Sequence, residues 1–214
     1  MLVTLLIVIS RPKRLYEHYC IRVISKRTIG QARRDPDRIT NPTKPGHVAR
    51  NELDSHADTC CAGANWAPML YTGEHCEVSP FLNTYDPVKE IPIARCCTVW
   101  TSDEGKEYLL VGDEMLWFGN TLTHSLLNPN QLRAYGLLVK DNPFDANEFG
   151  IDADEDFIPF ETMGTIVYFD SRVPTDWETT HLPAILLTAD TWDPKTINLS
   201  SGHSSHEEAE MRIV

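Results

Sequence analysis

The 214-residue sequence contains no run of about 20 apolar residues, the length that a helix needs to cross a bilayer. Its longest apolar run, residues 2–9, is interrupted by Thr4 and followed by Arg11, Lys13 and Arg14. A secretory signal would have a basic segment before such a run and a small-residue cleavage site after it, and both are missing. The sequence therefore predicts no membrane partner.

The six cysteines include no Cys-x-x-Cys pair, so a structural zinc site made from them is not expected. Four of them stand as adjacent pairs, Cys60–Cys61 and Cys96–Cys97, inside apolar segments. Neighbouring side chains of a strand point to opposite faces, so this pattern favours small buried thiols over a disulfide framework. Reduced cysteines predict an intracellular, cytoplasmic protein.

Basic residues are scarce in most of the chain. Residues 1–50 contain 11 Lys and Arg against 3 Asp and Glu, whereas residues 51–214 contain 8 against 28. Such an acidic body repels phosphate backbones, so nucleic-acid binding is unlikely except through the basic leader. We expect residues 1–49 to be this leader and a disordered linker, because they combine basic residues and prolines with few apolar anchors.

Beyond the leader, short apolar runs alternate with turn signals about every 8 to 12 residues. This spacing favours a mainly β fold. The clearest hairpin joins residues 91–100 to residues 107–111 through a turn at residues 102–106. A second tight turn is expected at residues 112–114, and one helical segment at residues 130–136, where Gly136 is suited to the C-terminal cap.

The most informative segment is Glu-Leu-Asp-Ser-His-Ala-Asp-Thr, residues 52–59. Asp54 follows an apolar-flanked strand and precedes the hydroxyl of Ser55, the small Ala57 and a second carboxyl, Asp58. A carboxylate at a strand end beside a turn is exposed enough to react and rigid enough to be aimed. The same residues also fit an Asx-turn that merely ends a strand.

This segment resembles the Asp-Thr/Ser-Gly-Ala signature of retropepsin-like aspartic proteases, in the form found in copia-type retrotransposon Gag-Pol polyproteins. Residues 124–136, His-Ser-Leu-Leu-Asn-Pro-Asn-Gln-Leu-Arg-Ala-Tyr-Gly, look like the later apolar motif and helix of that family. Residues 169–175 and 191–194 look like segments that follow the protease in such elements. The resemblance covers about residues 50–195, in the family's order.

The resemblance implies a retropepsin-like closed barrel over residues 50–143, followed by a β-rich extension over residues 144–197 and a disordered tail over residues 198–214. It also implies an aspartic endopeptidase that hydrolyses the peptide bonds of a polyprotein or peptide substrate without a cofactor. Two facing carboxylates sharing one proton would activate the water. Because the chain has one such motif, the second Asp54 must come from another copy in a homodimer.

By the same resemblance, Ser55 would lock the two loops together across the dimer axis, and Ala57 would leave room beside the catalytic water. The fold also requires Asp54 to lie beside Leu126 and Leu127, which we expect to line the cleft.

A flap over the cleft is expected from the hairpin of residues 100–118. Its tip would be either residues 103–105 or the turn at Gly112–Asp113–Glu114, and the second has the more flap-like glycine. Closing such a flap would exclude water from the cleft.

Two residues depart from the family pattern. His56 stands where the usual motif has a glycine whose backbone N–H approaches the catalytic carboxylate, and a side chain there restricts the backbone or crowds the cleft. Asn128 stands where the later apolar motif ends in glycine. These departures leave open a catalytically inactive relic or a structural spacer that associates with other copies.

A metal site is the third hypothesis. On an extended strand, the alternating Asp54, His56 and Asp58 would face one way and offer carboxylate and imidazole ligands to a transition metal. His75 or His124 would supply the fourth ligand. His124 and Ser125 give no sign of a serine hydrolase, since no Gly-x-Ser-x-Gly elbow accompanies them.

Overall fold

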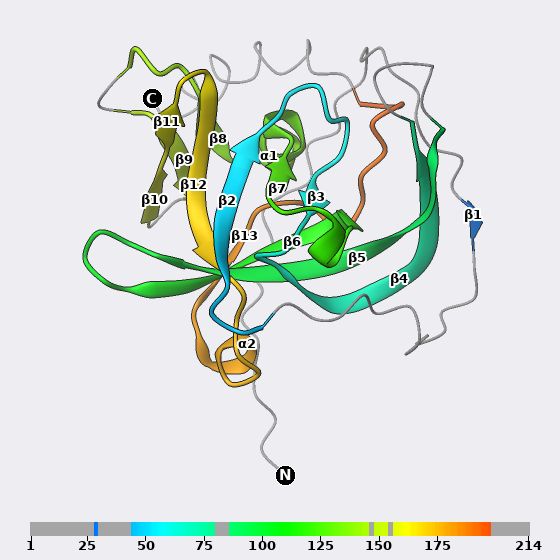
Figure 1. Ribbon diagram of the computed structural model, residues 1–214. Helices are drawn as coiled ribbons and strands as arrows, with labels where there is room; N and C mark the ends of the chain where they lie inside the picture. Colours follow the sequence, from blue (N-terminus) through cyan, green and yellow to red (C-terminus); the bar gives the residue numbers. More distant parts are fainter. Residues whose placement is uncertain (1–27, 30–43, 80–85, 146–147, 154–155, 198–214) are drawn as a thin grey trace, which may run out of the picture.

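The computed structural model describes residues 28–29, 44–79, 86–145, 148–153 and 156–197, which form a mainly β protein (Figure 1). The strands are β1 (Thr28–Ile29), β2 (Val48–Leu53), β3 (Cys61–Ala62), β4 (Ala67–Val78), β5 (Val88–Thr101), β6 (Glu107–Trp117), β7 (Ser125–Leu127), β8 (Leu138–Lys140), β9 (Gly150–Ala153), β10 (Asp156–Pro159), β11 (Glu161–Met163), β12 (Ile166–Arg172) and β13 (Ala184–Leu186). The helical elements are η2 (Gly119–Thr121), α1 (Pro129–Tyr135) and α2 (Glu178–His181). No helix in this described part combines the length and the hydrophobicity needed to cross a membrane.

One large sheet organises the molecule. Its strand order is β1-β4-β5-β12-β2-β7-β3-β6-β13, with β11 paired to β12. β5 also pairs with β6. The strands β5, β12, β2, β7, β3 and β6 therefore form a closed ring in which each strand pairs with the next. The three strands β10, β9 and β8 form a second, smaller sheet. The predicted mainly β class is confirmed.

The expected hairpin is present between β5 and β6. Ser102 and Lys106 close its turn, where the amide of Ser102 donates to the Lys106 carbonyl at 2.8 Å. Gly105 adopts a φ of +80°, a conformation that glycine reaches without a steric penalty. The rings of Trp100 and Tyr108 stack across the pair with centroids 5.7 Å apart. The hairpin projects from the body at the left of Figure 1.

The second expected turn, at Gly112–Asp113–Glu114, is not formed, because β6 continues through it. The register changes between Ala94 and Cys96 of β5, where β6 carries one residue more. Glu114 accommodates the extra residue with a φ of +55°. This is a β-bulge, and it bends the strand instead of reversing it.

The segment beyond residue 143 contributes to the main sheet. β12 pairs antiparallel with β2, and Arg172 at its end pairs with Val99 of β5. β13 pairs parallel with β6. One of the two strands beside β2 therefore comes from the C-terminal part of the chain, and the extension and the first part share one sheet.

A buried polar network joins β12 to β2. The side-chain amide of Asn51 donates to the Phe169 carbonyl at 3.2 Å and to the Ser171 hydroxyl at 2.8 Å. Its carbonyl oxygen accepts from Asn65 at 3.0 Å and from the Trp66 indole at 2.7 Å. Because buried polar groups are costly when unpaired, this network fixes the register of β2, the strand that leads to Asp54.

The described cysteines are Cys60, Cys61, Cys76, Cys96 and Cys97. All of them are buried and free, as the sequence predicted. Burial raises the pKa of Cys60 and of Cys97 to about 12, so both are neutral thiols. Cys20, most of the basic leader and the tail at residues 198–214 lie outside the described residues. Within the leader, Thr28–Ile29 pair with β4.

Candidate functional site

The loop of residues 54–60, between β2 and β3, carries the predicted carboxylate. β2 runs parallel to β7, with Glu52 beside Leu126 and Leu53 beside Leu127. The ladder continues one step further, since the amide of Asp54 donates to the Leu127 carbonyl at 3.0 Å. The expected approach of Asp54 to Leu126 and Leu127 is therefore observed, and it holds the first residue of the loop on the main sheet.

The Asp54 carboxylate has one engaged oxygen. Its Oδ1 accepts from the backbone N–H of His56 at 2.8 Å and lies 3.6 Å from the His56 Nδ1. No residue in the described part of the chain donates a hydrogen bond to its Oδ2. This geometry is that of an Asx-turn, and it leaves the Asp54 side chain 34% exposed.

His56 does not crowd the carboxylate. Among the described residues, the non-glycine positions with positive φ are Glu90 and Glu114, so His56 does not need the backbone freedom of glycine. Its side chain is 85% exposed and extends into solvent. Ser55 is exposed beside it at the tip of the loop. The backbone restriction expected of a histidine at this position is therefore absent.

The second half of the loop is anchored by α1 and the residue before it. The Asn128 side chain donates to the Ala57 carbonyl at 2.5 Å. Its oxygen caps α1 by accepting from the amides of Asn130 and Gln131. The amide of Cys60 donates to the Gln131 Oε1 at 2.7 Å. Asn128, which we noted only as a departure from glycine, thus connects the helix to the loop.

Leu126 and Leu127 face different environments. Leu127 is 1% exposed and belongs to the main core, so its side chain does not line a cleft. The expectation that both leucines line the cleft is therefore wrong for Leu127, because alternate residues of a strand face opposite sides. Leu126 is half-buried against a second apolar cluster, formed by Cys61, Cys76, Ile93 and Leu116 with Val78 and Ile91 at its margin.

Gly112 and Asp113 do not form a flap tip. Both are buried inside β6, and a side chain added at Gly112 would collide with the sulfur of Met115. Asp113 lies 3.6 Å from the Arg95 guanidinium, and burial raises the pKa of its carboxyl. The remaining candidate turn, residues 102–106, projects to the left in Figure 1, whereas the Asp54 loop lies at the top.

The structure does not have the geometry that the metal hypothesis requires. It required Asp54, His56 and Asp58 to alternate on a strand, but β2 ends at Leu53 and these residues lie in a loop. His124 instead approaches the Arg50 guanidinium, with its Nε2 2.9 Å from Nη2. Within the described ranges, no group of three or more His, Cys, Asp or Glu side chains is arranged to hold a metal ion.

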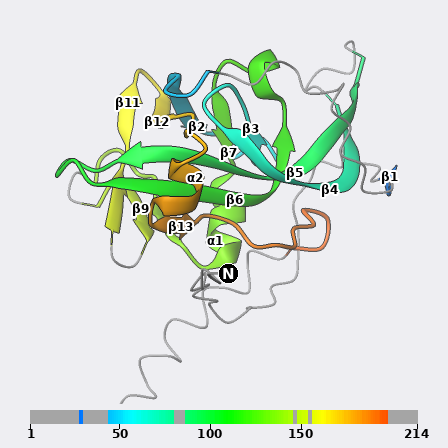
Figure 2. The same ribbon diagram turned by 90° about the horizontal axis from the view of Figure 1, so that it is seen from below.

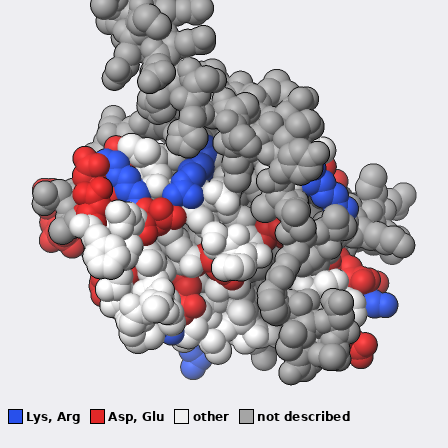
Figure 3. All heavy atoms as spheres, turned by 90° about the horizontal axis from the view of Figure 1, so that it is seen from above, with Lys and Arg blue, Asp and Glu red and all other residues white. Residues whose placement is uncertain are grey.

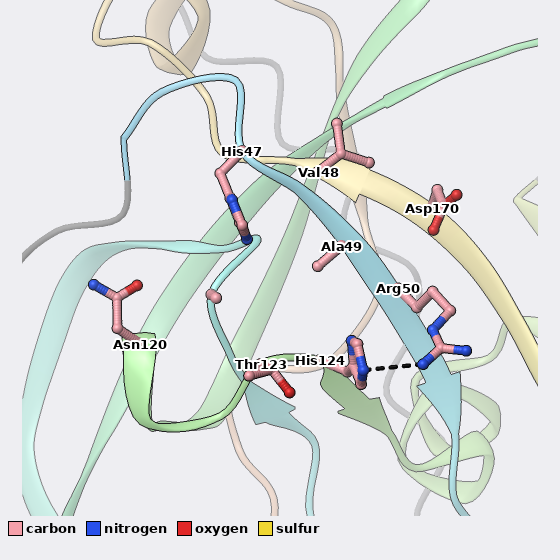
Figure 4. A pocket seen from close by; sticks show the side chains of 9 residues that line it. His47, Val48, Ala49, Arg50, Asn120, Thr123, His124 and Asp170 are labelled. Atoms are coloured by element: carbon pink, nitrogen blue, oxygen red, sulfur yellow. Dashed lines mark hydrogen bonds between the residues drawn. The ribbon is translucent and has the colours of Figure 1, made fainter.

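An open pocket of about 570 Å³ lies beside the first half of β2 (Figure 4). On one wall of this pocket, the Arg50 guanidinium lies against the His124 ring. Arg50 is also paired with Glu52 at 3.1 Å. The pocket is lined by His47, Val48, Ala49, Arg50, Ala64, Asn120, Thr123, His124 and Asp170.

Sequence reasoning also missed a contact to the loop from the C-terminal segment. The indole N–H of Trp192 donates to the Asp58 carbonyl at 3.0 Å and to the Thr59 hydroxyl at 3.2 Å. Burial raises the pKa of the Asp58 carboxyl, an effect opposed by its hydrogen bond to Thr59 and by the charge of Lys195. No local pattern signals a contact between residues so far apart in the sequence.

The loop lies on an acidic molecule. Figure 3 views the molecule from above, the side on which the Asp54 loop lies, and shows Asp and Glu side chains across the described surface with single Lys or Arg side chains between them. Chemically, the site offers one anchored and accessible carboxylate per chain. Comparison of the chain with protein-family models, with curated proteins and with solved structures finds no match.

Proposed function

We propose that this chain is a homodimeric, retropepsin-like aspartic endopeptidase from a copia-type retrotransposon polyprotein, with Asp54 as its catalytic carboxylate. The observation that carries the proposal is the anchoring of the Asp54 loop against Leu127 and Asn128. The resemblance required these distant segments to meet. An Asx-turn that merely ended a strand would not need the later apolar motif beside it.

The chemistry follows from two Asp54 carboxyls that share one proton. The ionised carboxylate takes a proton from water while the water oxygen bonds to the peptide carbonyl carbon. The protonated partner gives its proton to the carbonyl oxygen, which yields a tetrahedral diol. The carboxyl that took the proton from water then gives it to the peptide nitrogen, and the C–N bond breaks. At the same time a diol hydroxyl gives its proton to the partner carboxylate and becomes the carbonyl of the new carboxyl terminus, so the two carboxyls again hold one proton.

The backbone of His56 supports this role. In the usual motif, the glycine contributes a close N–H to the carboxylate, and here the His56 N–H makes that contact at 2.8 Å. A hydrogen bond to the charged form of a carboxyl stabilises it. The substitution of glycine by histidine thus keeps the donor and adds an exposed imidazole.

The second carboxylate would come from a partner copy. Ser55 and His56 form the exposed tip of the loop, so they are free to meet the same residues of a second chain across a two-fold axis. Such an isologous contact would bring the two Asp54 side chains together. The homodimer is therefore part of the proposal, because a single chain supplies only one Asp54 loop.

The peptide would lie on the side of the loop to which Leu126 turns. Leu126 is half-buried with Val78 of β4 and Ile91 of β5 at the margin of the second apolar cluster. These side chains would contact apolar side chains of the substrate. The β4–β5 pair, in place of the hairpin of residues 100–118, is thus the proposed border of the peptide groove.

A cleavage assay tests the proposal. The purified chain, verified as a dimer, is incubated at mildly acidic pH with a peptide mixture, and new termini are identified by mass spectrometry. We expect cleavage by the unaltered chain and none by Asp54→Asn, while Asp103→Asn, in the exposed hairpin turn, serves as the matched control. Cleavage that survives Asp54→Asn would exclude the mechanism, and a verified dimer without activity would favour the silent relic or spacer.

A further inference from the structure

The C-terminal segment of residues 184–193, which we call the strap, follows β6 to the Asp54 loop. β13 lies parallel to β6, with Leu186 beside Val111. The next amide, of Leu187, donates to the Val111 carbonyl at 2.8 Å. The Thr188 hydroxyl then donates to the Asp113 carbonyl at 2.7 Å. Figure 2 shows this course, with the orange segment beside β6.

The strap is packed against the body at three buried side chains, those of Leu187, Thr188 and Trp192. Leu187 and Thr188 are each 1% exposed, and Trp192 is 7% exposed. Such burial gives the strap a defined position at these residues, because removing an indole from water stabilises the packed state. The Trp192 indole therefore contacts the loop from a fixed position.

Trp192 holds a part of the loop that no described residue of β7 or α1 holds. Asn128 binds the Ala57 carbonyl and Gln131 binds the Cys60 amide. Between those two contacts, the Asp58 carbonyl and the Thr59 hydroxyl both accept from the Trp192 indole. The loop is consequently fixed from two sides, by the segment at residues 128–131 and by the strap.

We propose that Trp192 is a positioning residue, whose indole N–H fixes the Asp58–Thr59 end of the loop and thereby the aim of the Asp54 carboxylate. The inference rests on the proposed function for its effect on catalysis. The restraint of the loop by the strap does not depend on the proposed function. An indole nitrogen only donates, and Trp192→Phe removes this N–H together with part of the buried ring system, so indole exchange in the unaltered chain is measured beside the variant.

The experiment compares Trp192→Phe with Trp177→Phe in the full chain. Trp177 is 61% exposed and stacks on His181, so its replacement is the matched control. Backbone hydrogen exchange is measured by mass spectrometry on a peptide that covers the loop. A lost hydrogen bond contributes about 1 kcal/mol, so Trp192→Phe should accelerate exchange of the loop about fivefold, and Trp177→Phe should leave it unchanged.

Kinetics on the same variants separate positioning from general structure. A misaimed carboxylate lowers kcat and leaves KM unchanged, because substrate binding does not require the transition-state geometry. We expect Trp192→Phe to lower kcat about fivefold at constant KM. If the unaltered chain cleaves no peptide, the proposed function fails, whereas the exchange measurement still decides the restraint of the loop by Trp192.

One measurement does not depend on the folding of a variant. In the unaltered chain, the Trp192 indole N–H should exchange with solvent far more slowly than that of Trp177 in a proton–nitrogen NMR spectrum. Equal exchange of these two indoles, or loop exchange that is unchanged by Trp192→Phe, would overturn the proposal.

Discussion

The amide of Asp54 donates to the carbonyl oxygen of Leu127 at 3.0 Å, although more than seventy positions separate these residues in the chain. The contact extends the parallel pairing of β2 with β7 into the loop. It places the start of the Asp54 loop and the start of α1 on neighbouring strands. The first two predictions concern Leu126, Leu127 and Asn128, which lie next to this hydrogen bond.

Truncation of Leu127 should mainly lower stability, whereas truncation of its neighbour Leu126 should mainly affect substrate binding. Leu127 is 1% exposed, so Leu127→Ala should lower the free energy of unfolding by about 2–5 kcal/mol through the lost burial and the cavity. Leu126 is half-buried at the proposed groove, so Leu126→Ala should cost less stability and raise KM for apolar peptides. Urea denaturation and steady-state kinetics measure the two effects. Equal losses of stability without a change in KM would contradict the assignment of Leu126.

Asn128 combines two contacts that substitutions can separate. Asn128→Ser keeps an oxygen that caps α1 but is too short to reach the Ala57 carbonyl, so it should lower kcat with little change in stability. Asn128→Ala removes both contacts and should cost about 1 kcal/mol more in the free energy of unfolding. Urea denaturation and a peptide assay on both variants check this order. Full activity of Asn128→Ser would show that the Ala57 contact does not position the loop.

The elements that the sequence predicted are those with local signals. The β5–β6 hairpin was predicted because Gly105 and its polar neighbours mark the turn, and α1 because Gly136 suits its C-terminal cap, whereas the N-terminal cap at Asn128 was not foreseen. Gly112–Asp113–Glu114 has the composition of a turn, yet cross-strand pairing with β5 makes it a bulge. Such pairing depends on distant residues, so a local pattern cannot reveal it.

Long-range contacts also explain what was missed around the site. The position of Asp54 beside Leu127 was predicted from a family resemblance, since no local rule links them. Nothing indicated that β12 would pair with β2, or that Trp192 would reach Asp58. In each case, the partner is fixed by packing of the whole sheet.

An ion pair at the end of β12 should make stability depend on pH. The Arg172 guanidinium binds both carboxylate oxygens of Glu178, at 2.7 and 3.0 Å, and lowers the Glu178 pKa from 4.5 to about 2. A lowered pKa in the folded state means that the stabilisation is complete above pH 4.5 and is lost as the pH falls toward 2. Glu178→Gln should therefore lower stability by about 1 kcal/mol at pH 7.

This difference should shrink as the pH falls from 4.5 through about 2, the pKa of Glu178 in the folded state, and thermal unfolding across that range measures it. Glu104→Gln, in the exposed hairpin turn, is the control and should change stability little at either pH. If Glu178→Gln lowered stability by the same amount from pH 7 to pH 2, the ionised Glu178 carboxylate would not be the source of the stabilisation.

The most direct test of the central claim mixes two forms of the chain. Unaltered and Asp54→Asn chains are unfolded together in equal amounts, refolded so that dimers form at random, and assayed for peptide cleavage at a fixed total concentration. If the site needs an Asp54 from each copy, only dimers of two unaltered chains are active, and activity falls to about a quarter of that of the unaltered sample. Activity of about half would mean that each chain carries its own complete site, and would contradict the account.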